Sequence, residues 1–593
     1  MARNKYDVDE SLESEFNITY VKRILKYLKP YKKEMLITLA IMLIASVANL
    51  IGPYLIKIAL DTKIPNKDIN GLMVLSLIFF ATVIINGICL NFKIKIMTNV
   101  GQSVVQTIRR DLFTHLQKLP FNYYDSRPHG KILVRVVNYV NTLSDLLSNG
   151  IISLITDSFT LMVIVVFMFL IDVRLTLISL VGLPVLIGAA FSIKTMQRKA
   201  WQNLSSKSSN LNAYIHESIC GMKVTQSFSR EKENLKIFGE LSNNYRQAWM
   251  KSVKMQFLMG PFVDNIGNLV VAAVYIFGVS WISKGVTVGV LIAFIGYIGR
   301  FWTPINNLAN TYNSIINAMA YLERIFETLD EEPTVKDISE AFEMPEIQGN
   351  VKFKNVNFSY DDGHRILNNV SFNAKRGESI ALVGPTGAGK TTIINLISRF
   401  YDIENGEILV DGINIRNVTL NSLRKQMGVM LQDSFIFSGT IIDNIRYGKL
   451  DATDEEVIAA AKAVRAHDFI VNLSEGYYTE VNERGSRLSV GQRQLISFAR
   501  ALLADPKILI LDEATSSIDT KTEMLLQKGL EELLKGRTSF IIAHRLSTIK
   551  NSDRIMYIDR GTITESGSHE ELMKAKGEYY ELYMGQYKML EVV

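Results

Sequence analysis

The stretch Gly384-Pro385-Thr386-Gly387-Ala388-Gly389-Lys390-Thr391 decides the fold of the second half of the chain. It has the spacing G-x-x-x-x-G-K-S/T, follows an apolar segment at residues 380–383 and precedes a helix-forming segment at 392–400. A strand that turns through glycines into a helix presents backbone N–H groups and a positive helix end to a phosphate. We therefore expect an α/β domain in which Lys390 reaches the β- and γ-phosphates of a nucleotide and the Thr391 hydroxyl binds Mg²⁺.

A second apolar segment supports this interpretation. Residues 508–511 are followed by Asp512 and Glu513. A short apolar run fits a buried parallel strand, and its carboxyl end points to the crevice where ligands bind in open α/β sheets. Asp512 suits the Mg²⁺ shell, and Glu513 suits polarisation of the attacking water. The pair is a weak signal alone and a strong one beside the phosphate loop.

The first half of the chain carries apolar runs long enough to span a membrane. About 20 apolar residues cross the hydrocarbon layer, and six segments qualify, at residues 35–60, 72–94, 151–171, 175–193, 257–282 and 288–308. Residues 1–15 are polar and acidic, unlike the basic start of a cleaved signal peptide. The sequence therefore predicts a membrane all-α domain of six transmembrane helices.

The connections between these spans alternate in length, and the long ones are basic. Residues 95–150 and 194–255 show helical periodicity and many Lys and Arg, as does the segment 22–33. The positive-inside rule therefore places both termini in the cytoplasm. We expect the helices to extend into the cytoplasm as levers, with docking elements at Phe121–Asp125 and at residues 213–221. Ordinary cytoplasmic loops are the alternative.

Three charged residues lie at membrane depth or near its edge: Asp157, Asp264 and Arg300. Charges there are costly unless they face partner helices or a wet cavity. They indicate either a polar substrate path, an internal ion pair of Arg300 with one aspartate, or placement near enough to the interface to reach water.

The composition argues against a nucleic-acid-binding protein and against a disulfide-rich or metal-cluster protein. The net charge is +6, without the aromatic-interleaved basic stripe of a nucleic-acid-binding protein. Two cysteines, Cys89 and Cys220, cannot build a disulfide framework or a metal cluster. The acidic segment from Asp330 to Glu346, with Pro333 and Pro345, indicates an exposed linker.

With Leu488-Ser489-Val490-Gly491-Gln492 the pattern resembles the ATP-binding cassette (ABC) family. Nearly the whole chain is similar to a half-size exporter of its type IV (multidrug and lipid) branch. The resemblance implies that six membrane helices are fused to a soluble α/β P-loop nucleotide-binding domain with an inserted helical subdomain. It divides the chain into a cytoplasmic N-terminal segment with an elbow helix (1–34), a transmembrane domain (35–328), a linker (329–346) and a nucleotide-binding domain (347–593).

The resemblance also assigns residues to ATP and Mg²⁺. The catalytic residues would be Glu513, His544 and Gln432, and the Mg²⁺ ligands Thr391, Gln432 and Asp512. The nucleotide contacts would be Tyr360 (stacked on adenine), Gly384, Pro385, Thr386, Gly387, Ala388, Gly389, Lys390, Thr391, Thr392, Ser489, Val490, Gly491, Gln492 and Asp519.

The resemblance further implies that the segment from Ser489 to Gln492 completes the ATP site of a partner chain, as the start of a helix whose N-terminus would face the γ-phosphate. Val490 departs from the family's more frequent glycine, and we expect its side chain to point away from the nucleotide. Glu483-Arg484-Gly485 resembles the exporters' loop before the signature, and Ser516-Ser517-Ile518-Asp519 is a mild variant of the segment after Glu513.

We therefore predict an ATP hydrolase that exports amphipathic or hydrophobic compounds, either drugs, lipids or peptides, by alternating access. Its partners would be a second half-transporter of the same or a related chain, the lipid bilayer and a small amphipathic substrate, with no nucleic acid. Its place would be a bacterial plasma membrane. A soluble cassette ATPase, an importer and an ATP-gated channel are the competing functions.

Overall fold

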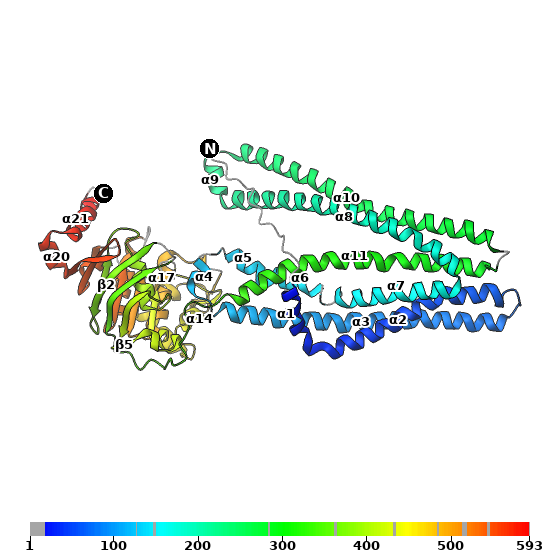
Figure 1. Cartoon of the computed structure of the whole chain (residues 1–593). Helices are drawn as coiled ribbons and strands as arrows, with labels where there is room; N and C mark the ends of the chain where they lie inside the picture. Colours follow the sequence, from blue (N-terminus) through cyan, green and yellow to red (C-terminus); the bar gives the residue numbers. More distant parts are fainter. Residues whose placement is uncertain are drawn as a thin grey trace. The chain divides into compact units, whose positions relative to one another are not determined.

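In the computed structural model the chain forms two compact units (Figure 1). One unit holds Met1–Gln117 and Pro128–Glu331, and the other holds Lys118–Arg127 and Glu332–Val593. The structure describes residues 18–125, 127, 129–145, 147, 150–282, 285–360, 364–430, 434–482, 485–512, 519–542 and 546–591. A short piece of chain from between two long helices of the first unit thus belongs to the second.

The first unit is built from long helices (Figure 1). Its main helices are α1 (Ile18–Leu28), α2 (Lys32–Ile58), α3 (Ile69–Leu116), α7 (Ile151–Ile171), α8 (Val173–Cys220), α9 (Met222–Ser227), α10 (Glu231–Ser280) and α11 (Val288–Asp330). Shorter helical segments are η1 (Lys29–Tyr31), η2 (Ala59–Lys63), α5 (His129–Val134), η3 (Arg135–Tyr139) and α6 (Val140–Asp145).

Four of these helices are far longer than a bilayer is thick. Helices α3 and α8 have 48 residues each, α10 has 50 and α11 has 43. At 1.5 Å per residue they measure about 65–75 Å, against about 30 Å of hydrocarbon. Helices that continue past the membrane are therefore confirmed. The docking element expected at residues 213–221 stays a prediction: residues 213–220 form the last turns of α8, and the separate short helix α9 begins after Gly221.

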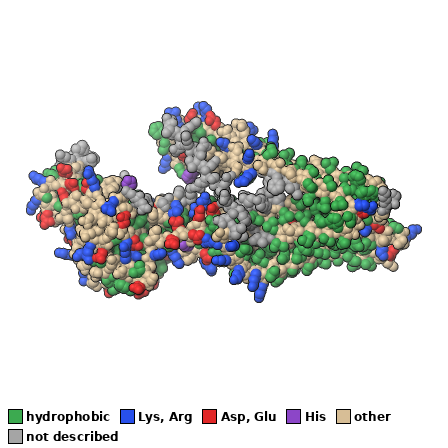
Figure 2. Space-filling model, in the orientation of Figure 1, with side chains coloured by type: hydrophobic (Ala, Val, Ile, Leu, Met, Phe, Trp, Pro, Cys, Tyr) green, Lys and Arg blue, Asp and Glu red, His purple; other side chains and the backbone are tan. Residues whose placement is uncertain are grey.

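Five helices of the described chain are apolar and long enough to cross a membrane: Lys22–Lys63, Ile69–Leu116, Ile152–Ile171, Glu231–Ser280 and Val288–Leu308. The sixth predicted span, at residues 175–193, falls inside α8, where the apolar helix Val173–Val185 is shorter. Hydrophobic side chains dominate the visible outer surface of these helices (Figure 2). Pro261 lies inside the continuous helix α10, and Pro304 lies inside the continuous helix α11.

The core of the first unit forms where α11 meets α2 and α7. Phe294 and Tyr297 of α11 are fully buried, and the Tyr297 hydroxyl donates to the Leu50 carbonyl oxygen at 2.9 Å. At the beginning of α11, Asp61 accepts hydrogen bonds from Thr287 Oγ1 at 2.6 Å and from the Gly289 amide at 2.9 Å. These contacts fix η2, which follows α2, against the first turn of α11.

The second unit contains a parallel sheet and an antiparallel sheet. Its strands are β1 (Val351–Ser359), β2 (Arg365–Ala374), β3 (Ser379–Val383), β4 (Asn405–Val410), β5 (Ile413–Asn414), β6 (Met427–Met430), β7 (Gly439–Thr440), β8 (Glu480–Val481), β9 (Ile508–Asp512), β10 (Thr538–Ile542), β11 (Arg554–Asp559) and β12 (Thr562–Gly567). The sheet orders are β12-β11-β3-β10-β9-β6, with β12 antiparallel to β11, and β2-β1-β4-β5. The predicted strands 380–383 and 508–511 are therefore buried parallel strands, as expected.

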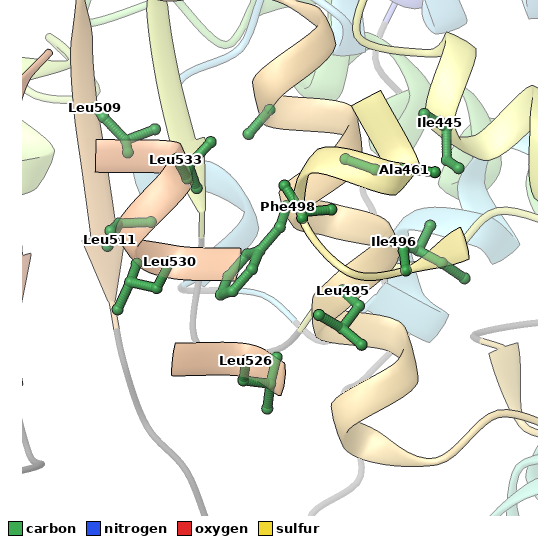
Figure 3. Packing of buried hydrophobic residues seen from close by; sticks show 14 of the residues in the cluster. Ile445, Ala461, Leu495, Ile496, Phe498, Leu509, Leu511, Leu526, Leu530 and Leu533 are labelled. Atoms are coloured by element: carbon green, nitrogen blue, oxygen red, sulfur yellow. The ribbon is translucent and has the colours of Figure 1, made fainter. Parts of the chain in front are cut away.

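Helices complete this unit and form a second core beside the parallel sheet. They are α4 (Phe121–Asp125), α12 (Lys390–Ile397), η6 (Ile415–Asn417), α13 (Leu420–Arg424), α14 (Ile441–Arg446), α15 (Asp454–Ala463), α16 (His467–Val471), η7 (Gly476–Tyr478), α17 (Val490–Leu503), α18 (Thr520–Leu534), α19 (Leu546–Lys550), α20 (His569–Ala575) and α21 (Glu578–Glu591). Figure 3 shows Phe498 of α17 beside Leu530 of α18, with Ile445 of α14 and Ala461 of α15 nearby. This group of helices corresponds to the predicted inserted helical subdomain.

The segment between α11 and β1 is exposed over most of residues 330–346, as expected, but its end packs against the cassette. Met344 and Ile347 are buried in the core beneath the sheets. Their amides donate to Ser422 Oγ and Gln426 Oε1, both at 2.8 Å. The acidic and proline content indicated an exposed linker, but these two apolar side chains fix its second part to the cassette.

Candidate nucleotide-binding site

The phosphate loop leaves β3 at Val383 and enters α12 at Lys390. Gly384 and Gly389 have φ values of +139° and +107°, in a region that glycine alone adopts readily. A Cβ atom on Gly384 would lie 2.1 Å from the Ile558 carbonyl oxygen, and one on Gly389 would lie 2.8 Å from Leu367 Cδ2. Both glycines are therefore required for the loop to close against its neighbours.

Lys390 lies beneath this loop and is buried. Its Nζ atom donates to the carbonyl oxygens of Gly384 at 2.7 Å and Pro385 at 2.8 Å. Burial lowers the pKa of its ammonium group, and the nearby Asp512 carboxylate opposes that shift. The ammonium group is therefore held against the loop backbone at the start of α12, where Thr391 is exposed in the first turn.

Tyr360 follows β1 and contacts the phosphate-loop helix. Its hydroxyl lies 3.1 Å from Thr392 Oγ1. The edges of Phe358 and Tyr401 meet its ring at centroid distances of 4.9 Å and 5.0 Å. The ring is thus held by two aromatic neighbours while the residue stays 37% exposed, which leaves surface for a flat ligand.

Asp512 ends β9 at the same edge of the sheet as the phosphate loop. It is aligned with Ile542 of β10, which is aligned in turn with Leu382 of β3. Because the strands are parallel, their carboxyl ends meet there. The carboxylate of Asp512 and the hydroxyl of Thr391 are oxygen ligands of the kind that Mg²⁺ prefers, and the site chemistry therefore fits this ion.

Ser489 begins the helix α17 on an exposed part of the surface. Its Oγ atom accepts from the Gln492 amide at 3.2 Å, while Gln492 Oε1 accepts from the Ser489 amide at 2.9 Å. This reciprocal capping fixes the helix start. Gly491 is buried and Val490 is 42% exposed, so the positive end of α17 is presented outward.

Asp519 occupies the corresponding position at the start of α18. Its carboxylate accepts from the Thr522 amide at 2.9 Å, and this hydrogen bond lowers its pKa. Three predicted catalytic residues, Gln432, Glu513 and His544, lie outside the described residues, as do Glu483, Arg484 and residues 516–518.

Sequence reasoning missed Arg500, which ties α17 to the segment that follows residue 432. Its guanidinium donates to the Asn444 carbonyl and side-chain oxygens at 2.8 Å and 3.0 Å, and to the Phe435 carbonyl oxygen at 3.1 Å. Burial lowers the pKa of this group. The signal available in the sequence was an arginine in the last turn of a predicted helix. Exposed arginines often occupy this position as well, so the signal did not single out Arg500.

The predicted docking element at Phe121–Asp125 is a short helix of the cassette unit. Its Phe121 ring packs on Phe400 at a centroid distance of 5.3 Å, and the Tyr401 hydroxyl donates to Asp125 Oδ2 at 2.9 Å. Burial, together with this hydrogen bond, raises the pKa of Tyr401. The docking prediction for this turn is confirmed, because α4 lies against residues that directly follow the phosphate-loop helix.

The fold and the site define a multi-pass membrane protein fused to a P-loop ATPase cassette. Residues 35–305 match the model of the ABC transporter transmembrane region, and residues 367–516 match the ABC transporter model of the cassette. The chain is 43% identical over 590 residues to the uncharacterized ABC transporter ATP-binding protein YknV of Bacillus subtilis, which covers 99% of this chain and 98% of the relative. It is 36% identical over 589 residues to the ATP-dependent lipid A-core flippase of Syntrophus aciditrophicus, with 99% and 98% covered.

A comparison with solved structures indicates the same family. The structure of a bacterial Atm1-family ABC exporter with ATP bound has a TM-score of 0.79 and 30% identity, covering 94% of this chain and 98% of that one. The chain therefore belongs to the ABC transporter family, as a type IV exporter half-transporter whose ATPase cassette is coupled to transport. A half-transporter architecture implies dimerisation.

Proposed function

We propose that two such chains export amphipathic or hydrophobic compounds from the cytoplasmic side of a bacterial plasma membrane by alternating access. The observation that carries this proposal is the contact of α4 with the cassette, because α4 is joined by the chain to the long helix α3. Movement of the cassette must then reach a membrane-spanning helix.

ATP binding would pull two cassettes together. Lys390 and the phosphate loop of one chain would hold the phosphates, and Ser489 and Gly491 of the other would close the site with the positive end of α17. The outward presentation of this helix end supports the proposal, since a capped helix N-terminus on the surface can meet a phosphate carried by another molecule.

The contacts around Tyr360 suggest how closure reaches the membrane helices. An adenine stacked on Tyr360 would press on Tyr401 through their ring contact. Tyr401 in turn holds Asp125 of α4. The nucleotide, the aromatic pair and the docking helix therefore form one connected path within the second unit.

Hydrolysis would need residues from the three loops after β6, β9 and β10. Glu513 would orient the attacking water, His544 would contact the γ-phosphate, and Gln432 would join Thr391 and Asp512 around Mg²⁺. When bound, Mg²⁺ would neutralise developing charge on the phosphates. Loss of the γ-phosphate contacts would let the cassettes separate, because the two states differ in their contacts with the ligand.

The substitution Glu513→Gln tests this proposal. The variant should bind ATP as the wild type does and nearly lose ATP hydrolysis and ATP-driven uptake into inside-out vesicles. Lys390→Ala is the matched control, which should lose ATP binding as well. Wild-type turnover by Glu513→Gln would overturn the catalytic assignment, and unchanged uptake without ATP hydrolysis would overturn active export.

A further inference from the structure

A polar cavity lies between α2, α3 and α11 of the first unit. Its volume is about 260 Å³. Four polar side chains line it: Asn49, Thr82, Asn86 and Arg300. It lies within helices that are apolar enough to cross a membrane, so polar groups gathered at one point there are costly unless they serve a ligand or water.

Arg300 has few partners for a charge at this depth. It follows the start of α11, Val288, by 12 residues, which is about 18 Å along the helix. Among the described residues its one hydrogen bond runs from Nη1 to the Gly296 carbonyl oxygen at 3.4 Å. A Cβ atom on Gly52 would lie 3.8 Å from its Nη2 atom, so the guanidinium fits against a bare stretch of α2.

The internal ion pair considered from the sequence is not found in the described chain. Neither Asp157 nor Asp264 forms a salt bridge with Arg300, and Asp157 instead lies 3.5 Å from Asn307 Nδ2. The guanidinium therefore keeps most of its donors available, since it carries five N–H groups in a planar fork.

We propose that this cavity binds the anionic headgroup, a carboxylate or phosphate, of a single-chain amphiphile, which thereby belongs to the substrate class of the exporter. Arg300 pairs with the anion, and the amides of Asn49 and Asn86 donate to its remaining oxygens. The inference rests on the proposed function, because it names the substrate class of that transporter.

The rest of the cavity wall fits the hydrocarbon part of such a ligand. Phe79, Val83 and Leu90 of α3 line it, and all three are exposed. The volume is close to the lower end of ligand pockets, about 300 Å³. It admits a headgroup and the first carbons of the chain, while the remaining carbons follow the apolar surface of α3. Cationic amphiphiles are rejected, because they would bring like charges together.

Direct binding to the purified protein in phosphatidylcholine nanodiscs, without ATP, tests the proposal. The probes are dodecyl phosphate, dodecanoate, dodecanol, dodecylammonium and inorganic phosphate. We expect the two anionic amphiphiles to bind, and Arg300→Gln to weaken both at least about tenfold while leaving dodecanol unchanged. The control Lys57→Gln removes the same charge from α2, where Lys57 lies over the Tyr54 ring outside the cavity, and should leave every affinity unchanged.

Asn86→Leu is a second variant, which changes no charge, and it should weaken the binding of both anionic amphiphiles. ATP binding to each variant checks that the chain is folded. Equal binding of dodecanol and dodecyl phosphate by the wild type would overturn the proposal, as would an Arg300→Gln affinity equal to that of the wild type. Binding of inorganic phosphate as tight as that of dodecyl phosphate would overturn the amphiphile assignment. Because binding is measured without ATP, these failures are distinct from a wild type that binds but does not export.

Discussion

Replacing Tyr401 by phenylalanine removes one hydrogen bond and leaves the docking helix otherwise in place. The lost contact is the 2.9 Å hydrogen bond from the Tyr401 hydroxyl to Asp125 Oδ2. Hydrogen bonds to charged groups are worth about 1.5–3 kcal/mol, but Asp125 is exposed, so we expect about 1 kcal/mol. That corresponds to about a fivefold change in the docking equilibrium. The packing of Phe121 on Phe400 remains.

The assay compares ATP-driven uptake with ATP hydrolysis in the same proteoliposomes. We expect Tyr401→Phe to lower uptake per ATP hydrolysed two- to fivefold, about the size of that equilibrium change, with basal hydrolysis retained. Tyr478→Phe is the matched control, because the Tyr478 hydroxyl donates to Asp454 Oδ2 at 2.8 Å elsewhere in the cassette. It should leave the ratio unchanged.

Two further results can refute this reasoning. A double-mutant cycle of Tyr401→Phe with Asp125→Ala should be non-additive, because both changes remove the same contact. Additive effects, or an equal loss of uptake per ATP hydrolysed in Tyr478→Phe, would show that this contact does not couple ATP hydrolysis to transport. The effect of pH has a definite sign: burial and Asp125 raise the pKa of Tyr401 above its usual value of about 10, so the stability that the contact contributes is fully present below about pH 10 and is lost as pH rises through the raised pKa.

Other predictions concern the cassette. Gly384→Ala should abolish ATP binding measured with a fluorescent ATP analogue, because its Cβ would meet the Ile558 carbonyl oxygen at 2.1 Å, and normal binding would contradict the loop geometry. Arg500→Ala should destabilise the packing of α14 on α17 by about 2–3 kcal/mol through three lost hydrogen bonds, seen as faster amide exchange in both helices, and unchanged exchange would refute it. His569 holds Tyr579 at 2.7 Å, and burial lowers the pKa of His569 below its usual value of 6.5. Protonation therefore favours the unfolded form: the protection factors of α21, which are corrected for the intrinsic pH dependence of amide exchange, should be highest above pH 6.5 and fall as pH drops below it, whereas protection factors that do not change with pH would contradict this.

The cassette could be predicted closely from sequence because its signals are local. The glycines of the phosphate loop are needed for backbone reasons that act within a few residues, and the run at 508–511 is apolar because its strand is buried on both faces. Asp512 and Gly384 reach one edge of the sheet through parallel topology, which short apolar strands already indicate.

Features that depend on distant contacts could not be predicted in the same way. Arg500 acts through Asn444, which is 56 residues away, and no spacing rule connects them. The buried part of the segment before β1 has an acidic composition, and its fixed position depends on Ser422 and Gln426. The cavity at Arg300 likewise needs three helices to meet, so the sequence indicated a charge at depth without its surroundings.

Cross-linking between chains tests the central claim most directly. In a background with Cys89 and Cys220 replaced by serine, Thr386→Cys and Ser489→Cys are combined with Glu513→Gln and treated with an oxidant. The account predicts a cross-linked dimer that forms with ATP and not without nucleotide, because each phosphate loop then meets the α17 helix of the other chain. Cross-links confined to single chains, or none while ATP is held, would contradict it.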